Sequence, residues 1–183
     1  MGVDIYPLNL GFTECYIIKG EEAIMIDSST SSKESFLKAI KKTPVAPEDI
    51  QLIVITHGHF DHIGSVNVLK ELTGAKVAMH RLDKNCLEKP ELRMPKAVGA
   101  WGIVLKTLLY LIKFFIKLPT TKVDLVIGDE GLPLTDYGVP GRVIYTPGHT
   151  SGSLSILLYS GEAFVGDLAM NKFPLRLGPG LSI

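Results

Sequence analysis

Short apolar runs, separated by glycine-containing or polar turns, recur along most of the chain. Runs of about four to eight residues that are rich in isoleucine and valine are typical of β-strands. Two further segments carry apolar residues at helical spacing, which predicts helices over residues 32–42 and 62–73. A Ser31-x-x-Glu34 capping pattern marks the start of the first helix. Strands are predicted over residues 3–10, 13–18, 22–26, 51–56, 76–80, 123–127, 142–146, 153–159 and 162–165. Strands with helices on their outer faces fit an α/β four-layer sandwich.

Residues 97–118 form a nearly continuous apolar run that ends before Pro119. Its charged residues are Lys106, Lys113 and Lys117, which lie within about 20° of one another around a helix axis. The run therefore predicts a helix that is apolar around most of its circumference, with one narrow cationic stripe. It is long enough to cross a bilayer, but each lysine would cost ~2.5–3.5 kcal/mol near the membrane centre. Three placements are open: a buried helix, a lip over an active-site cleft or a dimer contact, and a helix in the membrane interface.

The composition is that of an ordinary globular domain. The chain has 183 residues with 19 basic and 19 acidic side chains, so its formal net charge is zero. This balance argues against a nucleic-acid partner, which normally selects a basic surface. Cys15 and Cys86 suggest neither a disulfide framework nor a metal-binding pair. The N-terminus lacks the pattern of a secretory signal, so we expect a cytoplasmic protein, with peripheral membrane contact as the alternative. We expect one domain over residues 1–183, with an apolar helical insertion at about 84–120.

A histidine-rich turn follows the apolar run of residues 52–55. The sequence HGHFDH places His57, His59, Asp61 and His62 between a predicted strand and a predicted helix. Side chains two residues apart in an extended segment face the same way, and a residue at the helix start can reach round from the side. A single histidine is usually structural or solvent-facing, but three of the chain's five histidines gather here beside an aspartate. Imidazole nitrogens with a carboxylate are ligands that suit zinc and similar divalent ions.

Two later segments fit the same kind of site. His149 follows a Pro-Gly turn at the end of one predicted strand, and Asp167 follows a glycine at the end of another. An aspartate in such a place is by itself a routine turn residue, so a metal role for Asp167 depends on the histidine motif. His80 lies outside every metal motif, and we interpret it as structural.

In this order, the motifs resemble those of the metallo-β-lactamase superfamily, and particularly of its glyoxalase II-like hydrolases. The resemblance covers nearly the whole chain, from the strand-end Asp27 to the Gly-Asp pair at Asp167. It implies a four-layer αβ/βα sandwich with two divalent metal ions, of which zinc is our first expectation and iron or manganese the alternatives. The ligands that it implies are, for the first ion, His57, His59 and His149, for the second ion, Asp61 and His62, and, as a bridge between the two ions, Asp167.

Two aspartates take further roles by the resemblance. Asp27 would steady the ligand turn without binding metal, and a plain strand-end aspartate is an equally weighted alternative. Asp61 would orient a metal-activated water and pass its proton to the leaving group. The resemblance thus implies an enzyme that hydrolyses a small-molecule thioester, ester or lactone and needs no serine or cysteine nucleophile.

The family usually supplies one more histidine near its C-terminus, and none follows Asp167 in this chain. We therefore expect a chain that lacks the closing elements of the fold, with a natural short form as the alternative. Two other functions stay open. Without the last histidine and the closing elements, the chain could be an inactive or truncated metal-binding or membrane-associated interaction module. Because the ligands of the first ion do not distinguish hydrolases from dioxygenases, a mononuclear-iron persulfide dioxygenase is the other. The β-lactamases proper generally carry another residue type at the position of Asp167, which argues against antibiotic hydrolysis.

Overall fold

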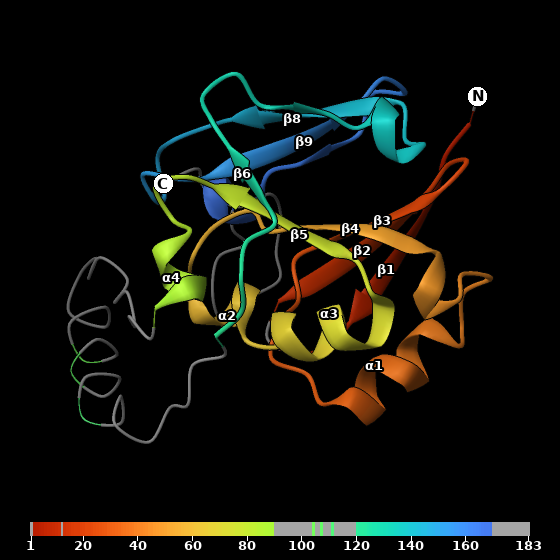
Figure 1. Ribbon diagram of the computed structural model, residues 1–183, viewed down its shortest axis with the longest axis horizontal. Helices are drawn as coiled ribbons and strands as arrows, with labels where there is room; N and C mark the ends of the chain where they lie inside the picture. Colours follow the sequence, from red (N-terminus) through yellow and green to blue (C-terminus); the bar gives the residue numbers. More distant parts are fainter. Residues whose placement is uncertain are drawn as a thin grey trace.

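Two β-sheets and a group of helices build the part of the chain that the structure describes (Figure 1). The computed structural model describes residues 2–11, 13–89, 104, 107, 111 and 120–169. The strands of the first sheet are β1 (Asp4–Asn9), β2 (Glu14–Lys19), β3 (Ala23–Ile26), β4 (Ile50–Val54), β5 (Lys76–His80) and β6 (Leu125–Ile127). Those of the second are β7 (Leu132–Pro133), β8 (Gly141–Tyr145), β9 (Leu154–Leu158) and β10 (Ala163–Phe164). The α-helices are α1 (Lys33–Ile40), α2 (Phe60–Ile63), α3 (Val66–Thr73) and α4 (Asn85–Glu88), and the short 3₁₀ helices are η1 (Pro47–Asp49), η2 (Thr135–Tyr137) and η3 (Gly166–Leu168).

The topology brings several loops to one edge of the first sheet. The strand order is β1-β2-β3-β4-β5-β6 in the first sheet and β10-β9-β8-β7 in the second. Strands β1 to β3 pair antiparallel as a meander, whereas β3 to β6 pair parallel. The carboxyl ends of parallel strands meet at one edge, where α/β sheets commonly carry their functional groups. Asp27, the turn at His57 and the turn after His80 all leave the first sheet at this edge.

Two apolar cores lie on opposite faces of the first sheet. Along β4, Ile53 packs in the core that contains Phe36 of α1 and Leu69 of α3. Its neighbours Leu52 and Val54 pack in the core shared with the second sheet. Strands β3 and β5 alternate in the same way, because successive side chains of a strand point to opposite faces. Strands that are buried on both faces appear as continuous apolar runs, which is why the sequence predicts them well.

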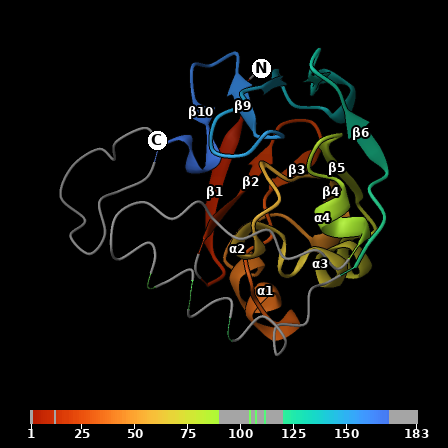
Figure 2. The same ribbon diagram turned by 90° about the vertical axis from the view of Figure 1, so that its left-hand side faces the viewer.

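The layers are therefore helices, first sheet and second sheet. Figures 1 and 2 show α1 and α3 on one side of the first sheet and β8 and β9 on the other. This arrangement supplies three of the four layers that the sequence predicts; a helical layer outside the second sheet is not among the described residues. The predicted strands are all present, with ends that differ by at most two residues, and β7 was not expected.

The start of α1 differs from the expectation by one residue. The side chain that caps the helix is Ser32, whose Oγ accepts a hydrogen bond from the backbone N–H of Ser35. The predicted cap at Ser31 is therefore wrong. Two serines in succession carry the same propensity for the cap position, and the sequence alone does not distinguish them.

The predicted helix over residues 62–73 is two helices, α2 and α3. Gly64 lies between them, and a Cβ at that position would come within 2.9 Å of the Ser29 carbonyl oxygen. The next residue, Ser65, donates a hydrogen bond from its hydroxyl to the Ser31 carbonyl. The junction between the two helices is thus packed and bonded to the loop after β3.

The predicted apolar helix over residues 97–118 and the chain after residue 169 lie largely outside the described residues. Within that helix, Val104, Thr107 and Leu111 are helical and exposed. No helix in the described part of the chain is both long and apolar enough to cross a membrane. A cleft lip, a dimer contact or a membrane-interface contact by this segment stays a prediction.

Candidate metal centre

Three histidine rings from two distant loops converge at the edge of the first sheet. The His57 Nε2 atom lies 3.1 Å from His59 Nδ1, and His149 Nε2 lies 2.8 Å from the same His59 atom. The rings meet edge to face, with centroids 4.6–4.7 Å apart. Asp167 Oδ2 lies 3.4 Å from His149 Nε2 and 3.9 Å from His57 Nε2. Each of these four residues therefore presents one ligand atom to a common point, and the four atoms lie within 4.8 Å of one another.

A second group adjoins the first and consists of Asp61, His62 and Asp167. The Nε2 atom of His62 lies 3.2 Å from Asp167 Oδ1 and 3.7 Å from Asp61 Oδ2. This nitrogen is buried, and it has no hydrogen-bond partner among the described residues. A buried nitrogen that faces two carboxylates without a hydrogen bond is a position where a cation would satisfy all three groups.

Asp167 belongs to both groups, and each of its oxygens faces a different one. Oδ2 faces His57 and His149, whereas Oδ1 faces His62. The residue lies in η3, directly after Gly166, whose φ is +52°. A Cβ at Gly166 would come within 2.9 Å of the Thr56 hydroxyl, so only glycine lets the chain pass this close to the histidine turn.

Asp27 and Thr56 fix the orientation of two of the rings. Asp27 accepts hydrogen bonds from the Thr56 backbone N–H at 2.8 Å, from the Thr56 hydroxyl at 2.8 Å and from His62 Nδ1 at 2.9 Å. Because the Thr56 hydroxyl donates to Asp27, its oxygen can accept from His57 Nδ1, which lies 3.2 Å away. With their Nδ1 atoms engaged, His57 and His62 both turn Nε2 toward the cluster.

The loop that carries Asp27 is strained. Asp27 and Ser29 have φ angles of 58° and 52°, in the left-handed region that non-glycine residues rarely adopt. Such conformations cost about 1–3 kcal/mol each and persist where the surroundings hold them. Here the backbone N–H and the hydroxyl of Ser28 both donate to the His62 carbonyl oxygen, at 2.9 and 2.8 Å. The strain is thus tied directly to the position of a candidate ligand.

Two imidazoles of the first group, those of His57 and His59, are held neutral. Burial lowers the pKa of His57, and the neighbouring histidine rings lower it further. Burial also lowers the pKa of His59, with the charge of His149 acting in the same direction. A metal ligand must be the neutral imidazole, so burial prepares these rings to bind a cation.

In the second group, His62 is protonated in the absence of a metal ion. Burial acts to lower the pKa of His62, but the carboxylates of Asp27 and Asp167 outweigh it and raise the pKa to about 10. Burial acts to raise the pKa of Asp167, but the charge of His62, whose Nε2 lies 3.2 Å from Asp167 Oδ1, outweighs burial and lowers the pKa. Without a metal ion, the imidazolium of His62 therefore neutralises part of the negative charge at this place.

The donor atoms of both groups fit divalent metal ions. Zinc bonds to imidazole of about 2.0–2.1 Å in a tetrahedral site place neighbouring ligand atoms about 3.3 Å apart. The separations of 2.8 and 3.1 Å around His59 Nδ1 are close to that spacing. The structure thus brings together all six predicted ligands, and Asp27 supports one of them, His62, through a hydrogen bond.

Sequence reasoning missed three residues near the cluster. The Thr13 hydroxyl donates to Asp61 Oδ2 at 3.2 Å, and the buried Asp83 contacts both histidine loops. Neither residue lies in a motif, so the sequence carries no signal for them. Thr56 does carry one, since it directly precedes the histidine turn. His80 is buried against Tyr145, with stacked rings 4.3 Å apart, which agrees with a structural role.

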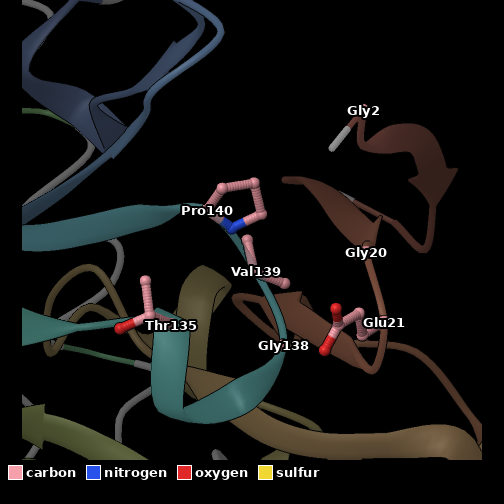
Figure 3. A pocket seen from close by; sticks show the side chains of 7 residues that line it. All are labelled: Gly2, Gly20, Glu21, Thr135, Gly138, Val139 and Pro140. Carbon is pink, nitrogen blue, oxygen red and sulfur yellow. The ribbon is translucent and has the colours of Figure 1, made fainter.

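A separate pocket of about 200 Å³ lies far from this cluster (Figure 3). Strand β3 begins beside the pocket and ends beside Asp27, and β8 likewise begins beside it and leads to the loop of His149. Its wall consists largely of backbone and small side chains, with a single carboxylate, and offers no histidine or cysteine. The lining residues are Gly2, Gly20, Glu21, Thr135, Gly138, Val139 and Pro140.

Comparisons with known proteins agree with the geometry. The family model described as "Metallo-beta-lactamase superfamily" matches residues 8–181. The chain belongs to this superfamily. The predicted superfamily and the α/β sandwich are thereby confirmed, and the superfamily's members are hydrolases that typically bind divalent metals.

Among curated relatives, an uncharacterized protein from Aquifex aeolicus is 30% identical over 156 residues, which cover 83% of this chain and 63% of the relative. A probable metallo-hydrolase from Methanocaldococcus jannaschii is 28% identical over 83% of this chain and 65% of its own length. The chain thus spans a little under two thirds of these relatives.

Solved structures with the same fold include the subclass B3 metallo-β-lactamase BJP-1 from Bradyrhizobium japonicum. It has a TM-score of 0.63 and 25% identity, and the match covers 84% of this chain and 53% of that one. A metallo-β-lactamase from Cronobacter sakazakii has a TM-score of 0.65 at 20% identity, over 87% of this chain and 57% of that one. At 20% identity this second likeness shows the fold alone.

Proposed function

We propose that the chain is a metal-dependent hydrolase that cleaves a thioester, ester or lactone in a small molecule. The observation that carries the proposal is the position of Asp167. One of its oxygens faces the histidines of the first group and the other faces His62. A carboxylate shared in this way suits two cations side by side, and two-metal sites are a common means of hydrolysis.

The proposal assigns two divalent ions, zinc first and iron or manganese as alternatives, to the two groups. The first would be held by His57, His59 and His149, and the second by Asp61 and His62, with Asp167 touching both. When bound, such ions would lower the pKa of water from about 15.7 to near 7 and would polarise the carbonyl that is attacked.

Asp61 is the residue that we assign to proton transfer. Its side chain is 43% exposed, against 20% for Asp167 and 4% for Asp27, so it is the carboxylate of the cluster that a substrate can reach. The Thr13 hydroxyl donates to its Oδ2 and limits its rotation. From this position Asp61 can take a proton from the attacking water and deliver it to the leaving group.

A protein nucleophile is not needed, and neither cysteine is suited to be one. Cys15 and Cys86 are both buried. Burial raises the pKa of the Cys15 thiol, and the charges of Asp27 and Glu14 raise it further. A reactive cysteine needs the opposite, an exposed thiol with a lowered pKa.

Two alternative functions make different predictions. A mononuclear-iron persulfide dioxygenase would need only the first group, and an inactive metal-binding or membrane-associated interaction module would bind one ion or none. The shared position of Asp167 favours a pair of ions over both alternatives. Cleavage of β-lactams is disfavoured by the same carboxylate, and the structural neighbours that bear that name share the fold.

The test is a substrate panel on purified protein loaded in turn with zinc, manganese and iron. Rates would be measured on thioesters, lactones, esters and a chromogenic β-lactam, and oxygen uptake on a persulfide. Asp61→Asn should lower the rate on the preferred ester or thioester by about 100-fold or more, in line with the usual contribution of general acid–base catalysis. The matched control is Asp136→Asn, which removes an exposed carboxylate in η2 and should keep the wild-type rate. Persulfide-dependent oxygen uptake without hydrolysis, or unchanged turnover by Asp61→Asn, would contradict the proposal.

A further inference from the structure

The turn after β5 contacts both loops that carry the histidines of the first group. Asp83 lies in this turn and is fully buried. Its Oδ2 atom accepts a hydrogen bond from the backbone N–H of Gly58 at 3.1 Å, and another from the Thr150 hydroxyl at 2.6 Å. Gly58 lies between His57 and His59 in the chain, and Thr150 follows the third histidine of the group. One oxygen atom thus joins two segments that are about ninety residues apart in the chain.

The hydrogen bonds around Thr150 have a consistent direction. Since its hydroxyl donates to Asp83, the Thr150 oxygen accepts from the Ser153 hydroxyl, which lies 2.9 Å away. The Ser153 oxygen in turn accepts from the backbone N–H of Thr150, also at 2.9 Å. Hydrogen bonds between Thr150 and Ser153 therefore close the loop of the third histidine, and the Thr150 hydroxyl is the donor that anchors this loop to Asp83.

Two glycines let the loops lie directly on this turn. A Cβ at Gly152 would come within 2.5 Å of Asp83 Cγ, and a Cβ at Gly58 within 2.6 Å of Cys86 Sγ. Contacts this close exclude any larger residue unless the turn moves. The turn after β5 and the start of α4 thus form a common surface on which both histidine loops are packed.

A second contact ties the same end of β5 to the loop of His149. The ring of His80 stacks on Tyr145 at a centroid distance of 4.3 Å and an interplanar angle of 6°. The Tyr145 hydroxyl donates to the Ser151 carbonyl at 2.9 Å. The loop of His149 is therefore held at Ser151 by Tyr145 and at Thr150 by Asp83. Asp83 also contacts the other histidine loop, at Gly58.

We infer that Asp83 is a positioning residue for the first metal group, because it fixes His57 and His59 relative to His149 from one buried carboxylate oxygen. This inference rests on the proposed function. Residues that orient metal ligands typically contribute about 10–100-fold to metal affinity without touching the ion. A carboxylate that merely stabilised the turn would change folding stability and leave the affinity of the folded protein unchanged.

The experiment measures the affinity of metal-free protein for Co²⁺ and Zn²⁺ by chelator competition, together with the visible spectrum of bound Co²⁺. Asp83→Ala should lower the affinity for the more tightly bound ion by about 10–100-fold and alter the Co²⁺ spectrum. Asp83→Asn, which keeps an acceptor oxygen, should lose less metal affinity than Asp83→Ala. Thr150→Val should weaken binding, and Thr150→Ser, which keeps the hydroxyl, should bind more tightly than Thr150→Val.

The control variant is Asp124→Asn at the other end of β5. Asp124 also accepts a backbone N–H, from Val77 at 2.9 Å, and its other side-chain hydrogen bond in the described part of the chain comes from the Lys70 ammonium, not from a histidine loop. It should keep wild-type affinity even where its melting temperature falls. If Asp83→Asn and Thr150→Val fold and bind Co²⁺ with wild-type affinity and spectrum, the positioning role is wrong while the proposed function stands. If the wild-type protein binds no divalent ion, the proposed function fails, and the inference fails with it.

Discussion

The two halves of the candidate metal centre are built in different ways. The first group draws its histidines from loops that are far apart in the chain, and packing against the turn after β5 holds those loops together. The second takes Asp61 and His62 from a single short helix, and only Asp167 comes from elsewhere. The first offers three imidazoles and a carboxylate, a complete tetrahedral set, whereas the second offers one imidazole and two carboxylates. We therefore expect the first ion to bind more tightly than the second.

The largest effect should come from the first group. His149→Ala removes one of three imidazoles and leaves the other two rings without their third partner. Affinity for the tighter ion should fall by more than about 100-fold, beyond the loss expected for an orienting residue, and hydrolysis should cease. Elemental analysis after dialysis would measure the loss. A variant that still retains the tighter ion would show that the two halves are not distinct in the way proposed.

Asp167→Asn should affect both halves at once. The amide keeps the shape of the side chain but removes the negative charge that both groups face, so both ions should bind more weakly, each by about tenfold or more. Calorimetric titration with Zn²⁺ resolves the two events. If only one event weakens, Asp167 belongs to one group and is not shared. The exposed Asp136→Asn serves again as the control.

Asp27→Asn should affect the two metal groups unequally. Asp27 orients His62 directly, whereas it reaches His57 only through the Thr56 hydroxyl. Affinity for the second ion should fall by about 10–100-fold, and affinity for the first should fall less. The same titration measures both. Equal losses would indicate that the Thr56 contact is as important as the direct one.

The smallest effect lies outside the centre. Partial burial acts to raise the pKa of Asp124, but hydrogen bonds from Lys70 and from the Val77 N–H outweigh it and lower the pKa below its usual value of 3.8. A carboxyl with a lowered folded-state pKa stabilises the fold above its unfolded pKa and loses this contribution as the pH falls through the folded value. Asp124→Asn should therefore lower stability by about 1 kcal/mol or less at pH 7. Melting temperatures should show the gap between wild type and variant shrinking below about pH 4; a gap that does not change with pH would contradict this.

The predictability of the molecule follows the same division between local and distant contacts. The central strands are visible in the sequence because both of their faces are buried, and the histidine turn is visible because its candidate ligands are neighbours in the chain. His149 and Asp167 were assigned through the family resemblance, since no local pattern shows that two separate loops meet. The cap at Ser32 and the break at Gly64 depend on contacts with neighbouring loops, which propensity does not contain.

Asp83 shows why part of the centre could not be predicted. An aspartate in a turn after a strand is common and indicates nothing by itself. Its importance comes from the partners that the fold supplies, a backbone N–H at Gly58 and a hydroxyl at Thr150. Thr13 was missed for the same reason, because its contact with Asp61 joins residues 48 positions apart. Contacts made by the backbone or by single hydroxyl groups leave no pattern of residue types in a sequence.

The most direct test of a two-cation centre is a calorimetric titration of the metal-free protein with Zn²⁺, with the bound metal counted by elemental analysis. We predict two equivalents that bind in two resolved steps, the tighter of which is lost in His149→Ala. Binding of a single equivalent, or of none, by correctly folded wild-type protein would contradict the account.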